Sequence, residues 1–151
     1  MRRSGTEEWQ EYLSKEYRFK IKYPSELHPF EYDGKRTIGF EAQGWKSGNV
    51  IIFCEPFQNH ETLDDLTKQY LSNISKDRLL SLKAIRISNN SINAIELIQD
   101  TLQQYTEFSK IIYIASIKDN VRYLLAWYGH DKVFSEEIGF FYLMVDSFEF
   151  V

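Results

Sequence analysis

Three histidines are the side chains of this sequence with the clearest capacity for chemistry. Imidazole nitrogens bind transition metals and exchange protons near neutral pH. His28, His60 and His130 fall in three separate predicted loops, and the third is followed by Asp131. If these loops converged, the four side chains would form a metal site suited to a small metal-assisted hydrolase. The spacing contains no H-x-x-x-H or C-x-x-C pattern, so we favour three separate exposed histidines and predict no metal site.

Other residue types that catalyse reactions are present without the neighbours they need. Cys54 lies in a predicted strand with no visible base or helix N-terminus beside it, which is typical of a small buried hydrophobic residue. There is no G-x-S-x-G nucleophile turn and no glycine-rich phosphate loop before a helix. Two acidic pairs, Asp64-Asp65 and Glu136-Glu137, each open a predicted helix, where acidic side chains are favoured. We therefore expect no catalytic residue, no cofactor and no enzymatic activity.

Two predicted loops carry aromatic residues that are suited to binding a partner. Trp45 has glycines on both sides and Lys46 next to it, and the loop after Pro24 contains His28, Phe30 and Tyr32. Exposed aromatic side chains are common anchors in interfaces. Trp45 has an equally weighted alternative, in which its ring folds back over the edge of the sheet. We expect both loops to be more exposed than the aromatic residues of the strands.

The composition is that of one ordinary globular domain. The chain has 151 residues, 43% of them hydrophobic and 26% charged, with a net charge of -4. This acidic balance gives no electrostatic footprint for nucleic acid, so a protein is the favoured partner. A single cysteine excludes an intrachain disulfide. We predict one domain over residues 1–151, with residues 1–6 as a disordered end.

The cellular compartment stays open at this stage. No stretch reaches the ~20 apolar residues that a membrane-spanning helix needs. The first residues, MRRSGTEEWQ, lack the apolar core of a signal peptide. The sequence as it stands is typical of a cytoplasmic protein, whereas a precursor whose N-terminal signal was removed would place the same residues outside the cell or at a membrane.

Hydrophobic periodicity predicts the strands. Residues 17–23 alternate strictly between apolar and cationic side chains, which is the clearest strand signal in the chain, and Pro24 ends it. Residues 121–128 are apolar on both faces, so we expect this strand near the centre of a sheet. The other predicted strands are residues 36–42, 49–55, 81–88, 92–100 and 108–117. Turns are expected at residues 44–48, 89–90 and 118–120.

Two longer segments have the period of a helix. In residues 62–74 the apolar side chains fall 3 or 4 residues apart, and Thr62 is a suitable N-cap. In residues 133–148 the apolar stripe includes Phe141, which we expect to face the sheet. The spacing of Trp9 and Leu13 favours a further helical turn in residues 7–14. Together these elements predict an α+β domain with an antiparallel sheet of six or seven strands packed against helices.

Three segments together resemble the PsbP-like superfamily. They are the YRFKIKYP run of residues 17–24, the TLDDL helix start of residues 62–66, and the final strand and helix that end in DSFEF at residues 146–150. The resemblance implies an αβα sandwich with an antiparallel sheet. The superfamily includes the extrinsic PsbP subunit of photosystem II and a Ran-binding nuclear import factor, and it is mostly non-catalytic. The chain departs from the familiar pattern after Pro24, where a tryptophan is expected a few residues on.

The resemblance therefore implies a binding or assembly domain whose partner is a protein. Two hypotheses stand at this point: such a binding domain, which we favour, and the metal-assisted hydrolase that would use His28, His60 and His130. The positions of the histidine rings relative to one another distinguish the two.

Overall fold

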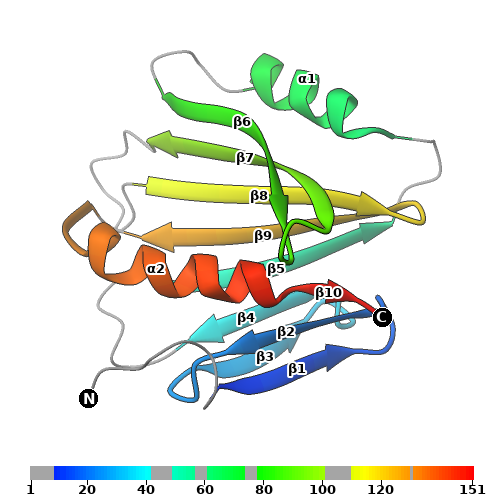
Figure 1. Cartoon of the computed structure of the whole chain (residues 1–151), viewed down its shortest axis with the longest axis vertical. Coiled ribbons are helices and arrows are strands. Elements are labelled where there is room, and N and C mark those ends of the chain that lie inside the picture. The colour runs from blue at the N-terminus through cyan, green and yellow to red at the C-terminus, as the bar shows by residue number, and fades with distance from the viewer. Residues whose placement is uncertain (1–8, 42–48, 57–60, 74–77, 101–109, 130) are drawn as a thin grey trace.

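The computed structural model describes residues 9–41, 49–56, 61–73, 78–100, 110–129 and 131–151, with side chains described except at Asn49 and residues 131–137. The described residues form two helices and two sheets (Figure 1). The helices are α1 (Leu63–Asn73) and α2 (Asp131–Ser147). The strands are β1 (Gln10–Ser14), β2 (Phe19–Tyr23), β3 (His28–Tyr32), β4 (Thr37–Glu41), β5 (Asn49–Pro56), β6 (Leu79–Ile87), β7 (Ile92–Asp100), β8 (Lys110–Lys118), β9 (Val121–Gly129) and β10 (Glu149–Phe150).

The large sheet has seven antiparallel strands in the order β3-β4-β5-β9-β8-β7-β6. β9 is the central strand, as its apolar residues on both faces predicted. Asp119 and Asn120 adopt positive φ angles of 52° and 62° in the two-residue turn between β8 and β9. Asn and Asp tolerate this left-handed conformation, and it matches the twist of a tight hairpin. The turn predicted at Asn89-Asn90 also has positive φ angles, 54° and 65°, and Ser88 before it has a φ angle of 55°.

A second, smaller sheet is formed by β1, β2 and β10. The alternation predicted for β2 is confirmed, since Phe19, Ile21 and Tyr23 are buried. The helical turn expected in residues 7–14 was wrong. This segment instead contains β1, which pairs with β2 so that Tyr12 lies opposite Ile21. The hydrogen bonds to β2, a partner that local spacing does not reveal, outweigh a helical preference that one i, i+4 pair supports only weakly.

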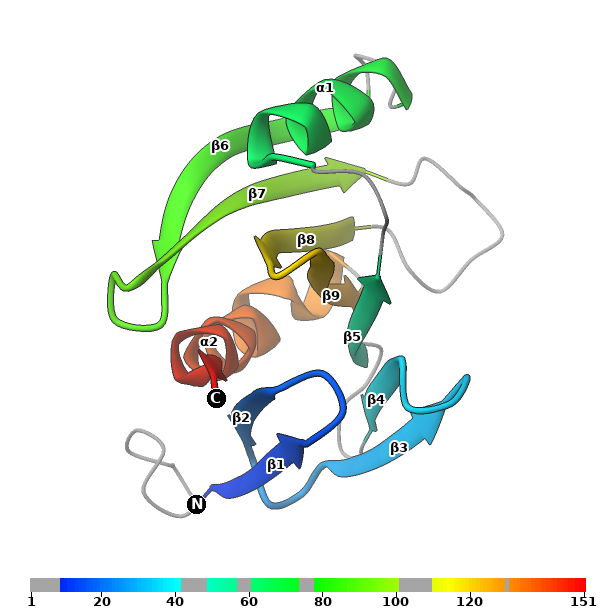
Figure 2. The same ribbon diagram turned by 90° about the vertical axis from the view of Figure 1, so that its right-hand side faces the viewer.

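The large sheet curves around α2 and the small sheet, and α1 lies on its other side (Figure 2). The main core fills the concave side, where Trp127 of β9, Phe19 of β2 and Phe141 of α2 are fully buried. Met144 and Val145 of α2, and Phe148 directly after the helix, are buried beside them. The expected apolar stripe of this helix is therefore confirmed, and the fold is the α+β sandwich that the sequence predicted.

Helix α1 is attached to the sheet by a much smaller contact. Leu66 is its buried residue, and it packs with Ile95 of β7 and Ala115 of β8. The predicted N-cap is confirmed. The amide of Asp65 donates to Thr62 Oγ1 at 3.2 Å, and the amide of Thr62 donates to Asp65 Oδ2 at 3.0 Å. This reciprocal pair satisfies two helix-end donors. The N-terminus of α1 is thus well capped, but the helix has a small buried contact with the sheet.

The loop expected over residues 25–32 was also wrong in part, because its second half is strand β3. β3 pairs with β4 and forms one edge of the large sheet. The ring of Tyr32 lies over Gly39 of β4, where a Cβ atom would come within 3.2 Å of Tyr32 Cε2. His28, Phe30 and Tyr32 share one face of β3, and this i, i+2 spacing is the strand signal that the sequence analysis missed.

Candidate functional site

The face of the large sheet that carries α1, called here the outer face, holds the main surface features. In the sheet register Phe53 lies opposite Leu124, and Leu124 lies opposite Ala115, so these residues share that face. α1 covers the part formed by β7 and β8. A hollow lies on each side of the helix, and the described residues that line the two hollows differ in chemistry.

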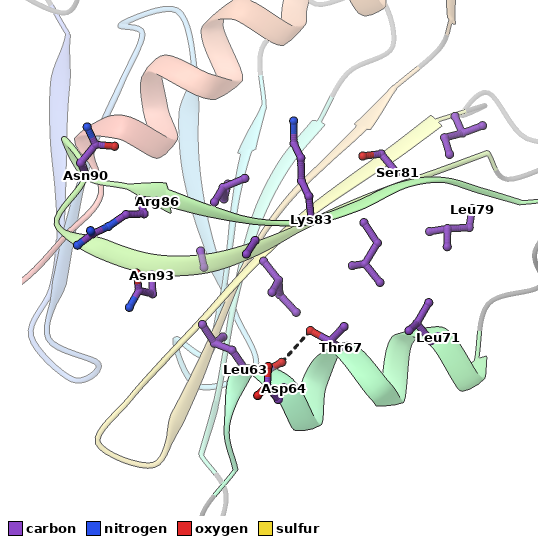
Figure 3. Close-up of a pocket in the computed structure, with 16 residues that line it drawn as sticks. Leu63, Asp64, Thr67, Leu71, Leu79, Ser81, Lys83, Arg86, Asn90 and Asn93 are labelled. Carbon is purple, nitrogen blue, oxygen red and sulfur yellow. Dashed lines mark hydrogen bonds between the residues drawn. The ribbon is translucent and has the colours of Figure 1, made fainter.

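The first hollow, the leucine groove, lies between α1 and strands β6 and β7 and has a volume of about 1070 Å³ (Figure 3). Figure 3 shows Leu63, Thr67 and Leu71 projecting from α1 toward the strands. Five of the sixteen lining residues are leucines, and they are Leu63, Leu71, Leu79, Leu80 and Leu82. Leu71 and Leu80 remain 53% and 51% exposed. Exposed leucines around one hollow form an apolar patch of the kind that marks interaction sites.

The polar residues around the leucine groove do not converge on one point. The hydroxyl of Thr67 donates to the carbonyl of Leu63 at 2.9 Å and is thereby occupied within the helix. Lys83 points away from α1 (Figure 3), and its Nζ lies 3.7 Å from Glu96 Oε1. No nucleophile and base are brought together among the described lining residues. The groove therefore offers apolar contact area and no evident catalytic chemistry.

Strand β6 borders this groove and is the last strand of the large sheet. It pairs with β7 along one edge, and among the described residues its other edge has no strand partner. The register shifts between Leu79 and Ser81, so Leu80 forms a bulge in the pairing with β7. Beyond the bulge, Leu82 and Ala84 lie opposite Leu97 and Ile95 on the outer face. The groove thus runs beside an unpaired strand edge.

The second hollow, the tyrosine pocket, lies on the other side of α1 and has a volume of about 450 Å³. Its described lining consists of Phe53, Glu55, Tyr70, Gln99, Tyr113, Arg122, Leu124 and Tyr128. The rings of Tyr113 and Tyr128 have centroids 6.0 Å apart and an interplanar angle of 89°, and their hydroxyl oxygens are 3.5 Å apart. Burial raises the pKa of Tyr128, and its contact with Tyr113 raises it further. Burial likewise raises the pKa of Tyr70.

One guanidinium group closes the rim of the tyrosine pocket. Arg122 Nη2 donates to both carboxylate oxygens of Glu61, at 2.7 and 2.6 Å. Its Nη1 lies 3.4 Å from Glu55 Oε2. The Glu61 side chain is 10% exposed, whereas that of Glu55 is 57% exposed. The guanidinium of Arg122 therefore pairs mainly with Glu61, and the carboxylate of Glu55 remains largely exposed to solvent.

Comparison with solved structures identifies the architecture. The solution structure of cyanobacterial PsbP (CyanoP) from Synechocystis sp. PCC 6803 matches with a TM-score of 0.71 and 13% identity, over 95% of this chain and 92% of that one. The fold is PsbP-like. A crystal structure from Bacteroides thetaiotaomicron VPI-5482 matches with a TM-score of 0.66 and 17% identity, over 94% of this chain but 48% of that chain. No protein-family model and no curated protein has a significant sequence match to this chain.

Only some of the site residues predicted from the sequence lie in the part of the chain that the structure describes. His28, Phe30 and Tyr32 lie on edge strand β3, where the two aromatic side chains are 45% and 48% exposed. Trp45 and Lys46 lie outside the described residues. His60 and His130 lie outside them as well, and Asp131 begins α2 with its side chain undescribed. Within the described residues no cluster of three or more His, Cys, Asp or Glu could hold a metal ion.

Cys54 is where the sequence analysis expected it. The thiol is buried on the concave side of β5, with 2% of the residue exposed. Burial raises its pKa to about 12, against an ordinary value of 9.0. A thiol in this environment stays protonated, so it packs as a small apolar group and does not act as a nucleophile.

Sequence analysis missed the residues that form the two hollows. Tyr113 and Tyr128 were placed correctly in strands, and Tyr70 in a helix, but none was singled out as part of a site. The available signal was that Tyr113, Ile111 and Tyr128 occupy the face of β8 and β9 opposite the main core. Their approach to Phe53 and Tyr70 depends on the pairing of strands far apart in the chain.

Within the part of the chain that the structure describes, neither helix combines the length and the hydrophobicity needed to cross a bilayer.

Proposed function

We propose that this PsbP-like domain is a non-catalytic binding domain that holds an extended segment of a partner protein along strand β6. The observation that carries the proposal is the leucine groove running beside the unpaired edge of that strand. A binding role agrees with the fold and with what the family resemblance implied.

The physical basis is the addition of a strand to a sheet edge. Backbone hydrogen bonds to the free edge supply affinity, and side-chain pockets beside it supply specificity. β6 offers nine residues for such pairing. Ala84, a small residue on its outer face, leaves room in the groove, and the exposed leucines Leu71 and Leu80 supply apolar contacts.

The opposite edge of the large sheet is less suited to this mode. β3 has five residues, and its second residue is Pro29. Short edge strands and prolines are features by which proteins prevent pairing at a sheet edge. β6 has neither feature within its nine residues, and the features of this kind that it carries are the irregular pairing at Leu80 and the cationic side chains Lys83 and Arg86. This contrast favours β6 as the edge that pairs with a partner.

The chemistry of the partner follows from the same surface. Nine of the sixteen lining residues of the groove are apolar, so the bound segment should carry apolar side chains at alternate positions. The net charge of -4 disfavours nucleic acid, whose binding requires a basic surface.

A second surface belongs to the proposal as a separate contact. His28, Phe30 and Tyr32 present two exposed aromatic rings on β3. Sequence analysis adds Trp45 and Lys46 as candidates. This surface would contribute side-chain anchors in place of strand pairing.

Photo-crosslinking tests where a partner binds. A benzophenone side chain is introduced at Leu80 in the groove, at Tyr32 on β3, or at Leu143 on α2 as an exposed control. The domain is then irradiated in an extract of its source organism. We expect a discrete protein adduct from position 80 and none from position 143. Ala84→Arg, which fills the groove on an exposed position, should abolish that adduct.

Two results would contradict the groove as the binding site. One is an equal pattern of adducts at positions 80 and 143, which indicates random collision. The other is an adduct at position 32 alone, which would transfer the site to β3. Circular dichroism of each variant checks that the fold is retained.

A further inference from the structure

The geometry points to the tyrosine pocket as a binding site for a small organic cation of the quaternary ammonium class. This inference uses a different hollow from the leucine groove and does not depend on the partner proposed for that groove. It rests on the aromatic walls, on the charges at the rim and on the size of the pocket.

Four of the eight described lining residues are aromatic. Phe53 of β5, Tyr70 of α1, and Tyr113 and Tyr128 of the paired strands β8 and β9 come from four different elements. The rings of Tyr113 and Tyr128 stand at 89° to each other and so form a corner. A cation over the face of such rings is attracted by the ring quadrupole, and clusters of this kind bind quaternary ammonium groups. Because burial raises the pKa of Tyr70 and Tyr128, these phenols are neutral at physiological pH.

The charges at the rim favour a cation over an anion. Arg122 is the cationic residue among the described residues that line the pocket, and Glu61 engages it through both carboxylate oxygens. One guanidinium between Glu61 and Glu55 leaves a net negative charge. Glu55 is 57% exposed and contacts Arg122 through Oε2 at 3.4 Å. An incoming anion would have to compete with Glu61, whereas a cation would gain from Glu55.

The type of cation follows from hydration and size. A primary ammonium is strongly hydrated and needs several acceptors to replace its water. The described lining supplies four aromatic rings, and its polar groups are Glu55, Gln99, the tyrosine hydroxyls and Arg122, which Glu61 engages. A methylated ammonium loses less hydration on entry and makes apolar contacts with the rings. The volume of about 450 Å³ admits a small molecule of this class.

The trimethylammonium group occurs both in free choline and in trimethylated lysine, and separate probes distinguish these sources. Isothermal titration calorimetry of the full chain would compare choline, Nε-trimethyllysine and 3,3-dimethylbutan-1-ol, the neutral isostere of choline. We expect binding of one or both cations and at least about tenfold weaker binding of the neutral isostere, since the attraction depends on charge. Tighter binding of choline indicates a free metabolite, and tighter binding of trimethyllysine indicates a modified lysine.

Variants test whether the aromatic faces and the rim carboxylate are responsible. Tyr113→Leu and Phe53→Leu remove a ring and keep an apolar side chain, and each should weaken cation binding about tenfold. Tyr113→Phe keeps the ring and should bind nearly as well as the original chain. Glu55→Gln should weaken cation binding without affecting the isostere. Tyr32→Leu, on the exposed ring of β3, is the matched control and should leave binding unchanged.

The inference is overturned if neither cation binds at millimolar concentration, or if the neutral isostere binds as well as choline. It is also overturned if Tyr113→Phe weakens binding as much as Tyr113→Leu, because the ring face would then be irrelevant. Thermal unfolding of each variant confirms that the fold is intact. The crosslink at position 80 should be unchanged by saturating choline, so this test and that of the partner site fail independently.

Discussion

Arg122 of β9 holds both carboxylate oxygens of Glu61, the second residue ahead of α1, at 2.7 and 2.6 Å. The side-chain amide of Gln69 in α1 donates to the same Glu61 at 2.8 Å. Glu61 therefore links the helix to the centre of the large sheet. Because Leu66 supplies most of the buried contact of α1, this ion pair is the second attachment that positions the helix between its two hollows.

Replacement of Glu61 tests this attachment. Glu61→Gln removes the charge from a pair whose side chains are 10% and 21% exposed, and it should cost about 1.5–3 kcal/mol, as for hydrogen bonds to charged groups. The loss should be local, so hydrogen exchange should accelerate in α1 more than in β8 or β9. Glu41→Gln, on the exposed side of β4, is the control and should leave the exchange of α1 unchanged. Uniform acceleration over the whole chain would contradict a local role.

Replacement of a core residue of α2 should cause a larger loss of stability. Phe141 is fully buried against the concave side of the sheet. Phe141→Ala should lower the free energy of unfolding by about 3–5 kcal/mol because it leaves a cavity. Leu143→Ala on the exposed side of the same helix should cost less than about 1 kcal/mol. Urea unfolding measures both, and similar midpoints for the two variants would place Phe141 outside the core.

The buried thiol predicts a dependence of stability on alkaline pH. Burial raises the pKa of Cys54 from 9.0 to about 12. Above pH 9 the unfolded chain releases this proton while the folded chain keeps it, so the free energy of unfolding falls between pH 9 and about 12. Cys54→Ala should show a shallower fall over that interval in urea unfolding. At pH 8 a thiol reagent should label the folded protein far more slowly than the protein in denaturant, and rapid labelling of the folded chain would show the thiol to be accessible.

Trp45 and Tyr32 are candidate anchors for a partner, so replacing either should weaken the binding of that partner and leave the stability of the fold unchanged. Trp45→Ala should weaken binding by more than about 1 kcal/mol, the scale of an interface anchor. Tyr32→Ala should do the same if β3 belongs to the contact, because its ring is 48% exposed. Titration against the captured partner and thermal unfolding would be run on each variant. Normal binding by both variants would remove this surface from the proposal.

Local sequence patterns were sufficient for several elements. The period-two alternation of β2, the apolar stripe of α2 and the capping residues of α1 each involve neighbours within a few positions. The turns at Asn89-Asn90 and Asp119-Asn120 depend on the tolerance of these residues for positive φ. Such features are set by steric preferences and burial, so they are visible before the fold is known.

Other features were decided by contacts between distant parts of the chain. β10 pairs with β2, so that Glu149 lies opposite Lys20, and this pairing forms the separate small sheet. β3 and β1 are short, and their patterns become strands only beside β4 and β2. The tyrosine pocket needs the register that sets Tyr128 opposite Ile111 and Tyr113 opposite Ala126. A shift of one residue would turn every side chain to the other face. The candidate sites therefore depend on long-range strand pairing, which the burial of the concave core stabilises and which no local pattern specifies.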